Sequence, residues 1–343
     1  MRIANQWRDY RLLDTSAGER LERWGSVVLI RPDPQVIWNT PRADPVWKQA
    51  DAHYLRSASG GGHWERRRQT AASWTLSYRE LRFQIKPTDF KHTGLFPEQA
   101  VNWDWMDARI RAAAQNRPVS VLNLFAYTGG ATLACAAAGA EVCHVDASKG
   151  MVGWARENAA LSGLQDRPIR WIVDDCKKFV QREIRRGHRY DAIVMDPPSY
   201  GRGPSGEVWH LEEQIYDLLQ LCAGALSDRP LFFLLNSYTT GLSAATMAYL
   251  LSVTVGNGRI GRVSAEEIGL PVDRTGLALP CGCTAIWECA DRSAPKGAAD
   301  EAGQEARFRR GSTRPQAAES MGESCAPRTG LAPQANCRAE CVG

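Results

Sequence analysis

Short apolar runs alternate with amphipathic stretches along the middle of the chain. The runs are almost continuously apolar, as strands are when both faces of a sheet are buried, and the stretches between them have the length and spacing of helices. Such runs occupy residues 119–127, 141–148, 169–175, 190–198 and 229–238. Strands that alternate with helices predict right-handed βαβ units, and therefore a doubly wound α/β domain with a mostly parallel sheet. Two further runs predict a closing pair of strands, one of them antiparallel, which would complete a seven-stranded sheet; they occupy 261–269 and 283–290.

Both ends of the chain differ from this middle part. The strand-like runs "ASWTLSY" and "LRFQIKP" are separated only by Arg79-Glu80, which predicts a hairpin. We therefore expect a small β-rich accessory domain at 1–90, ahead of the α/β domain at 91–290. The last segment, 291–343, is rich in Ala, Gly, Pro, Ser, Arg and Glu and holds few large apolar side chains, a composition that predicts a disordered tail.

The charge is uneven along the 343 residues, although the net charge is only +4. Basic side chains predominate in the first half, and acidic ones predominate in residues 191–290. A basic half is compatible with RNA as a partner, but an arginine-rich surface without that role has the same composition. The cluster Arg66-Arg67-Arg68 lies in a glycine-rich stretch that we interpret as a loop. It is either a solvated turn or a patch that contacts phosphates.

Membrane, secretion and metal signals are absent from the sequence. There is no apolar run long enough to span a membrane and no apolar leader after Met1, so we expect a cytoplasmic protein. Of the ten cysteines, several fall inside predicted helices or strands, as buried free thiols do. The pair Cys281 and Cys283 has no partner pair or histidine at zinc-site spacing, so we expect no metal.

Polar residues and glycines stand where the apolar runs end. The first strand runs into "NLFAYTGGA", whose glycines Gly129 and Gly130 begin a helix and allow a ligand to approach the backbone. The second and third strands end in Asp146 and in Asp174-Asp175. Ligands of such sheets bind beyond the carboxyl ends of the strands. Each aspartate taken singly has the alternative role of a helix cap, but their succession favours a nucleotide-like ligand.

The fourth strand ends in Asp196-Pro197-Pro198, and this motif separates two classes of nucleotide-binding protein. A dinucleotide-binding fold requires G-x-G-x-x-G after its first strand, where this chain has Tyr-Thr-Gly-Gly-Ala-Thr instead, and it gives Asp-Pro-Pro no role. The set resembles class I S-adenosylmethionine-dependent methyltransferases instead. With "FKHTGLFPEQ" (90–99) and the stretch that follows it, the chain resembles the branch that methylates 23S ribosomal RNA, which holds cytosine-C5 and guanine-N7 enzymes. The resemblance covers about residues 80–290.

This resemblance implies S-adenosylmethionine as the cofactor and RNA as the partner, and it assigns roles to single residues. The methionine part of the cofactor would lie against Asn123, Phe125, Tyr127 and Gly129. The ribose would be bound by Asp146 and the adenine edge by Asp175. A segment that folds over the cofactor in the relatives matches His92, Phe96 and Gln99. The carboxylate of Asp196 would lie between cofactor and substrate.

The chemistry of Asp-Pro-Pro motifs favours a nitrogen as the methyl acceptor. Asp196 and the Pro197 carbonyl would accept hydrogen bonds from an amine, with both prolines fixing the backbone, while an aromatic ring stacks on the base. Here Ser199 follows Pro198, so the aromatic residue, Tyr200, comes one position late.

Methylation of cytosine C5 needs an attacking thiolate. In the relatives a cysteine ends the fifth strand, whereas here that strand ends in "LNSY". We therefore expect methylation of a base nitrogen in RNA. The alternatives are cytosine C5, a protein or small-molecule substrate, and a non-catalytic RNA-binding factor that retains the fold.

Overall fold

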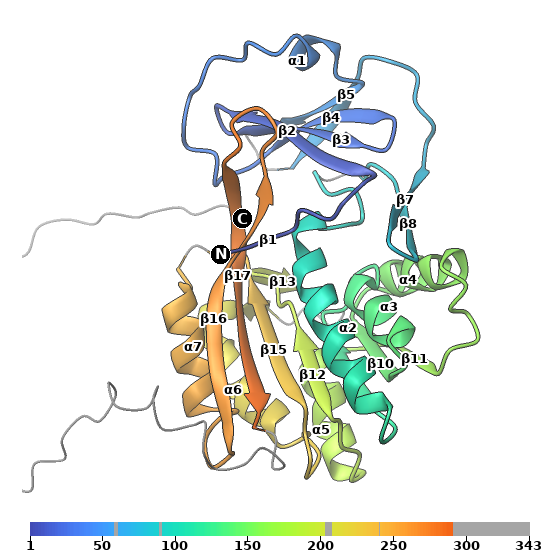
Figure 1. Ribbon diagram of the computed structural model, residues 1–343, viewed down its shortest axis with the longest axis vertical. Coiled ribbons are helices and arrows are strands. Elements are labelled where there is room, and N and C mark those ends of the chain that lie inside the picture. The colour runs from blue at the N-terminus through green and yellow to red at the C-terminus, as the bar shows by residue number, and fades with distance from the viewer. Residues whose placement is uncertain (58–60, 89–90, 203–207, 240, 291–343) are drawn as a thin grey trace, which may run out of the picture. The chain divides into compact units, whose positions relative to one another are not determined.

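A computed structural model describes residues 1–290 except 58–60, 89–90, 203–207 and 240 (Figure 1). The tail expected to be disordered lies outside these described residues. No helix in the described part is both long and apolar enough to cross a membrane.

An eight-stranded sheet forms the centre of the α/β part. Its strand order is β1-β16-β17-β15-β12-β9-β10-β11. In that order the strands are Arg2–Ile3, Gly261–Pro271, Ala278–Cys289, Phe232–Ser237, Ala192–Met195, Ser120–Leu124, Glu141–Asp146 and Ile169–Val173. All pairs are parallel except those of β17, which runs antiparallel to both neighbours. The mostly parallel, doubly wound sheet with an antiparallel closing strand is thus confirmed.

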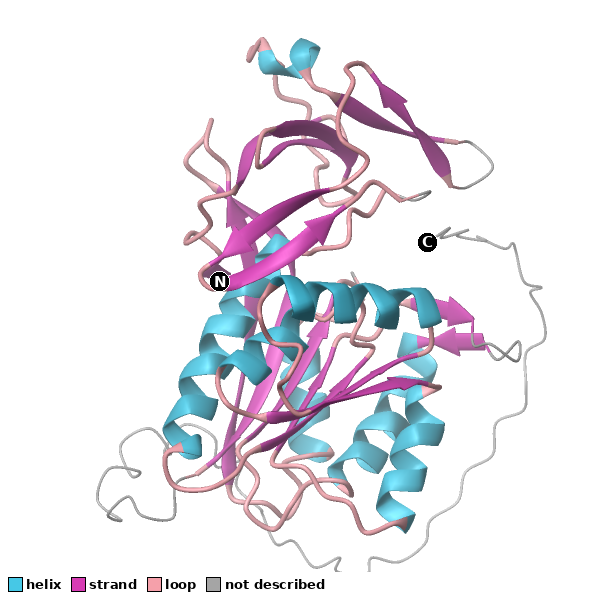
Figure 2. Cartoon of the chain, turned by 90° about the vertical axis from the view of Figure 1, so that its right-hand side faces the viewer, coloured by secondary structure: helices cyan, strands magenta, loops and turns pink. Residues whose placement is uncertain are grey.

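Helices cover both faces of this sheet (Figures 1 and 2). Successive residues of each strand point to opposite faces, so Val121 packs with one hydrophobic core and Leu122 with the other, as do Val194 and Ile193. The first core includes side chains of α2 (Ala100–Ala114), α3 (Gly130–Ala137) and α4 (Lys149–Leu161). The second includes side chains of α5 (Cys176–Arg185), α6 (Leu211–Ala223) and α7 (Ala244–Val253).

The N-terminal part is rich in strands, as the sequence predicts. A five-stranded sheet comprises β2 (Tyr10–Ser16), β3 (Glu19–Trp24), β4 (Val27–Pro32), β5 (Ala52–Arg56) and β6 (Gly62–Arg66), with the short helix α1 (Val46–Gln49) between β4 and β5. The predicted hairpin is β7 (Trp74–Tyr78) and β8 (Leu81–Ile85). Backbone N–H groups of β8 donate to the side chain of Asn158 in α4 and to that of Ser162, the C-cap residue of this helix. The first hydrophobic core also continues into this part through Trp24 and Phe83.

Three details differ from the sequence-based expectation. The central sheet has an eighth strand, β1, because two residues at the start of the chain pair with β16, and two residues carry no periodic signal. The arginine cluster does not lie wholly in a loop, because Arg66 ends strand β6. The chain does not pass directly from the fourth predicted strand into a helix, because the hairpin of β13 (Tyr200–Arg202) and β14 (Val208–His210) comes first and α6 begins at Leu211.

Candidate active site

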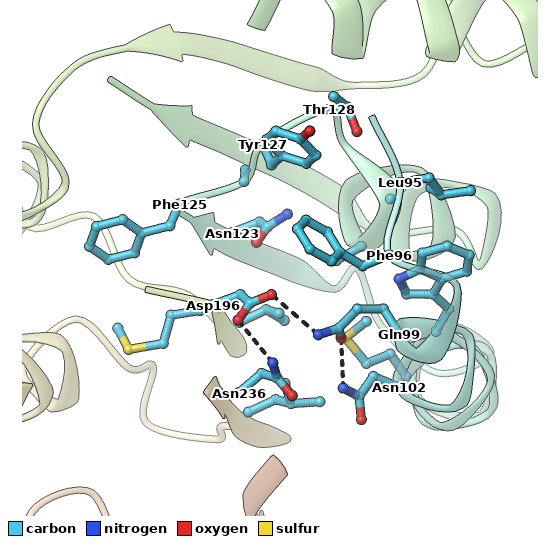
Figure 3. Close-up of a pocket in the computed structure, with 18 residues that line it drawn as sticks. Leu95, Phe96, Gln99, Asn102, Asn123, Phe125, Tyr127, Thr128, Asp196 and Asn236 are labelled. Carbon is cyan, nitrogen blue, oxygen red and sulfur yellow. Dashed lines mark hydrogen bonds between the residues drawn. The ribbon is translucent and has the colours of Figure 1, made fainter. Parts of the chain in front are cut away.

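A pocket lies at the carboxyl ends of β9, β12 and β15, the edge at which such sheets bind ligands. It encloses about 530 Å³ of space, including open solvent at its mouth. The 3-10 turn η1 (Pro97–Gln99) and the start of α2 form its opposite wall (Figure 3). The lining residues are Leu95, Phe96, Gln99, Asn102, Trp103, Met106, Asn123, Phe125, Ala126, Tyr127, Thr128, Gly130, Ala131, Val194, Met195, Asp196, Leu234 and Asn236.

The loop between β9 and α3 has an unusual backbone. Phe125 and Tyr127 adopt φ values of 54° and 50°, in a left-handed region that bulky side chains rarely occupy. The Phe125 N–H donates to Cys176 Sγ at 3.4 Å, and the Tyr127 N–H donates to Asp146 Oδ2 at 2.9 Å. Strained backbone of this kind persists only where its surroundings enforce it, and it concentrates at ligand sites.

Glycine is needed at two positions of this loop, Gly129 and Gly130, for different reasons. Gly129 has a φ of 90°, so a side chain there would be strained, and a Cβ would also lie 3.0 Å from Ala155 Cβ. Gly130 has an ordinary φ, but a Cβ would lie 2.7 Å from the Trp103 indole. Gly130 therefore makes room for the protein's own side chain, whereas Gly129 fixes the path of the loop.

The acidic residues at the second and third strand ends each accept backbone hydrogen bonds. Asp146 accepts from the N–H groups of Tyr127 and Ser148, and burial raises the pKa of its carboxyl. The N-cap of α4 is Ser148, so Asp146 is not that cap. Asp175 does cap its helix, since Oδ1 accepts from the Lys178 N–H at 2.8 Å. Neither carboxylate lines the pocket.

Both oxygens of Asp196 accept from side-chain amides. Gln99 Nε2 donates to Oδ2 at 3.2 Å, and Asn236 Nδ2 donates to Oδ1 at 2.9 Å (Figure 3). The Gln99 amide also donates to the Tyr238 hydroxyl at 2.9 Å. Desolvation nevertheless raises the pKa of Asp196 to about 7, with the Asn236 amide opposing the rise and Glu98 adding to it. This carboxyl can therefore exchange a proton near neutral pH.

Aromatic rings form the wall beside Asp196. The Phe96 ring lies 5.6 Å from the Tyr127 ring and 5.4 Å from the Tyr238 ring, between centroids. The His92 ring lies 5.5 Å from the Phe96 ring, between centroids. Burial, together with nearby Lys91 and arginines, lowers the pKa of His92 to about 3. The imidazole is therefore neutral at physiological pH. Electron-rich aromatic faces of this kind suit a cationic ligand.

The residues after Asp196 turn away from the pocket. Pro197 is buried and Pro198 is exposed, and the Pro198 carbonyl accepts from the indole of Trp209 at 2.6 Å. Tyr200 is 46% exposed on β13, and its ring lies edge-on to His210. The Trp209 ring also packs 5.5 Å from Phe125, which joins the hairpin to the strained loop.

Six of the residues given a site role from the sequence line the pocket: Phe96, Gln99, Asn123, Phe125, Tyr127 and Asp196. The others do not line it: His92, Gly129, Asp146, Asp175, Pro197, Pro198 and Tyr200. Sequence reasoning missed Asn102, Trp103 and Asn236. Asn236 lies near the carboxyl end of β15, and Asp196 directly follows β12, so the same signal, a polar residue at the end of an apolar run, identifies Asn236. Asn102 and Trp103 lie on α2, which the pattern did not reveal.

Comparison with known proteins yields a family match and a similar structure. The model of a family described as S-adenosylmethionine-dependent methyltransferase matches residues 51–216. The crystal structure of an S-adenosylmethionine-dependent methyltransferase from Agrobacterium tumefaciens is similar at a TM-score of 0.77 and 39% identity, covering 83% of this chain and 91% of that one.

Curated relatives carry the name ribosomal RNA large subunit methyltransferase K/L. That of Methylococcus capsulatus is 33% identical over 177 residues, 51% of this chain and 22% of its own length. That of Marinobacter nauticus is 27% identical over 229 residues, 66% of this chain and 29% of its own length. The chain therefore spans less than a third of the length of these two curated relatives.

Proposed function

This chain belongs to the S-adenosylmethionine-dependent methyltransferases, and we propose that it methylates a base nitrogen in ribosomal RNA. The proposal rests on Asp196, which lies at the carboxyl end of β12. Its carboxyl has a pKa of about 7 and accepts hydrogen bonds from two side-chain amides. The names of the curated relatives favour ribosomal RNA as the substrate class.

The pocket fits the family's cofactor in chemistry. S-adenosylmethionine supplies a methyl carbon activated by a positively charged sulfur. The aromatic faces of Phe96 and Tyr127 and the carboxylate of Asp196 suit that positive charge. We propose that Asn123, Phe125 and the loop through Gly129 hold the methionine part. Asp146 and Asp175 would bind the ribose and the adenine edge, since a carboxylate oxygen that accepts one backbone N–H keeps a lone pair for a second donor.

The acceptor side needs positioning rather than a nucleophile from the protein. An N–H of the base would donate to Asp196, which directs the nitrogen lone pair toward the methyl carbon. With a pKa of about 7, this carboxylate can also take up the proton that the nitrogen loses. Tyr200, on β13 four residues after Asp196 and exposed, would offer a ring on which an unstacked base can lie.

The described cysteines do not offer the thiolate that cytosine-C5 methylation needs. None of them lines the pocket. Cys281 is buried, and that burial together with Glu98 raises the pKa of its thiol well above the ordinary value. A protonated, buried thiol is a poor nucleophile. This supports a nitrogen acceptor.

Methyl transfer from labelled cofactor to purified substrates tests the proposal. Protein-free ribosomal RNA should become labelled, and nuclease digestion with mass spectrometry should place the label on a base nitrogen. Asp196→Ala should lower the rate by at least about 100-fold, the usual loss for a group that acts in proton transfer. Asp217→Ala, at an exposed position on α6, serves as the matched control and should retain the rate. Label in protein, or on cytosine C5, would contradict the proposal.

A further inference from the structure

We propose that Arg2, Asn102 and Thr284 form a relay that orients both amide donors of Asp196, and that these three are positioning residues of the site. The inference rests on the role proposed above for Asp196. None of the three touches that carboxylate. They come from β1, α2 and β17, elements far apart in the chain, and hydrogen bonds join Arg2 and Thr284 to Asn102, which lines the pocket.

The direction of the relay is set at Arg2. Its guanidinium donates to Asn102 Oδ1 at 2.8 Å, and a second nitrogen, Nε, lies 3.2 Å from a carboxylate oxygen of Glu266. A guanidinium has donors and no acceptor, so the carbonyl oxygen of the Asn102 amide must face it. The amide nitrogen, with its two N–H donors, must then face the other way.

One N–H of Asn102 begins the first arm. It donates to Gln99 Oε1 at 2.8 Å, which obliges the Gln99 nitrogen to point away from Asn102. That nitrogen uses its two N–H groups on Asp196 Oδ2 and on the Tyr238 hydroxyl. Figure 3 shows this arm as successive dashed lines from Asn102 to Asp196.

The second arm passes through a hydroxyl. Asn102 Nδ2 also lies 3.0 Å from Thr284 Oγ1, which accepts this hydrogen bond. The Thr284 proton is then available for Asn236 Oδ1 at 2.7 Å, and Asn236 must turn its nitrogen toward Asp196 Oδ1. Both arms therefore begin at the Asn102 amide and end at the Asp196 carboxylate.

Because the relay residues are buried, a wrongly oriented amide would leave polar groups without partners. Asn102, Asn236 and Thr284 are each 1% exposed, so water cannot replace a lost partner. A reversed amide would place a carbonyl oxygen against Asp196, which would favour the protonated carboxyl and leave no acceptor for the substrate N–H. Arg2, whose side chain can only donate hydrogen bonds, thus keeps the Asp196 carboxylate available as an acceptor for the substrate.

The test uses Thr284→Val, which removes the hydroxyl at nearly constant volume, with Thr284→Ser as the matched control. Cofactor affinity is measured by calorimetry against pH. Because the cofactor is cationic, its affinity should rise as Asp196 ionises, with a midpoint near the pKa of about 7. We expect Thr284→Val to raise this midpoint by about one pH unit and to lower kcat at neutral pH about tenfold, with KM for the cofactor at pH 9 unchanged within about twofold. Thr284→Ser should restore the wild-type midpoint.

A wild-type midpoint in Thr284→Val, or an equal shift in Thr284→Ser, would overturn the relay. Arg2→Met, which removes the guanidinium, should shift the midpoint in the same direction, and an unshifted midpoint would overturn the role of Arg2. Asp196→Asn should abolish the pH dependence, which assigns the midpoint. These binding measurements need no RNA, so failure of wild-type protein to methylate ribosomal RNA would refute the proposed function separately.

Discussion

At the scale of single residues, Asp196 combines two opposing influences. Two amides donate to its oxygens and favour the carboxylate, while desolvation favours the protonated acid and dominates, so that its pKa is about 7. The unfolded chain would titrate this group near its ordinary value of 3.8. Between these two pH values the folded state holds a proton that the unfolded state has released.

This difference predicts opposite pH trends for stability and activity. As pH rises from 4 to 7, Asp196 should reduce the free energy of unfolding of the cofactor-free protein by about 1–3 kcal/mol, because the unfolded state binds fewer protons. Methyl transfer should rise over the same range as the carboxylate forms. Denaturant unfolding of wild type and Asp196→Asn at pH 5 and pH 8 checks the first trend. An equal pH dependence in both proteins would contradict it.

Gly129 gives a second prediction at this scale. Gly129→Ala should destabilise the protein by about 1–3 kcal/mol and weaken cofactor binding, because φ is 90° and the new methyl group meets Ala155. Gly153→Ala is the matched control. It lies within α4 with nothing within 4 Å of the added Cβ, so it should stabilise by about 0.5–1 kcal/mol. Thermal unfolding measures both, and equal effects of the two substitutions would refute this account of the loop.

At the scale of elements, the hairpin β13–β14 connects the end of β12 with the loop after β9. Its Trp209 donates to the Pro198 carbonyl and packs against Phe125, which has a left-handed backbone. The hairpin therefore fixes both the segment that follows Asp196 and the loop between β9 and α3.

Trp209→Phe should separate these two contacts. The phenyl ring retains packing against Phe125, whereas the indole N–H to Pro198 is lost. We expect kcat to fall about 3- to 10-fold, since one neutral hydrogen bond contributes about 0.5–1.5 kcal/mol, while cofactor affinity stays within about twofold. Steady-state kinetics and calorimetry provide the two values. A loss confined to cofactor affinity would show that the hairpin acts on the other side of the pocket.

Elements also show what the sequence could and could not predict. Continuous apolar runs identified five strands, so the position of Asp196 directly after the fourth was found from local pattern, whereas the role of Asn123 came from the family resemblance. The pattern could not reveal β1, whose two residues are too few for periodicity. Nor could it bring Asn102 and Thr284 together, because their contact depends on β17 lying antiparallel beside β15 and on where α2 packs.

At the scale of the whole molecule, the N-terminal part and the α/β part share a hydrophobic core. Trp24 and Phe83 belong to the same buried cluster as Met106 and Val121, and the Phe83 and Trp103 rings lie 5.3 Å apart. A continuous core of this kind couples the folding of the segments that form it.

Unfolding of residues 1–290 should therefore be a single cooperative transition. Tryptophan fluorescence and far-ultraviolet circular dichroism should give the same midpoint in denaturant. Phe83→Leu should shift both midpoints together and lower the free energy of unfolding by about 1–2 kcal/mol, through lost packing against Trp103. Two separate transitions, with only one moved by the substitution, would contradict the shared core.

We propose that this methyltransferase modifies a base nitrogen of ribosomal RNA. The most direct measurement is nucleoside mass mapping of ribosomal RNA from cells that lack the chain, compared with the same cells expressing wild type or Asp196→Ala. We predict that one N-methylated nucleoside is lost, that wild type restores it and that Asp196→Ala does not. An unchanged set of methylated nucleosides, or loss of 5-methylcytidine instead, would contradict the account.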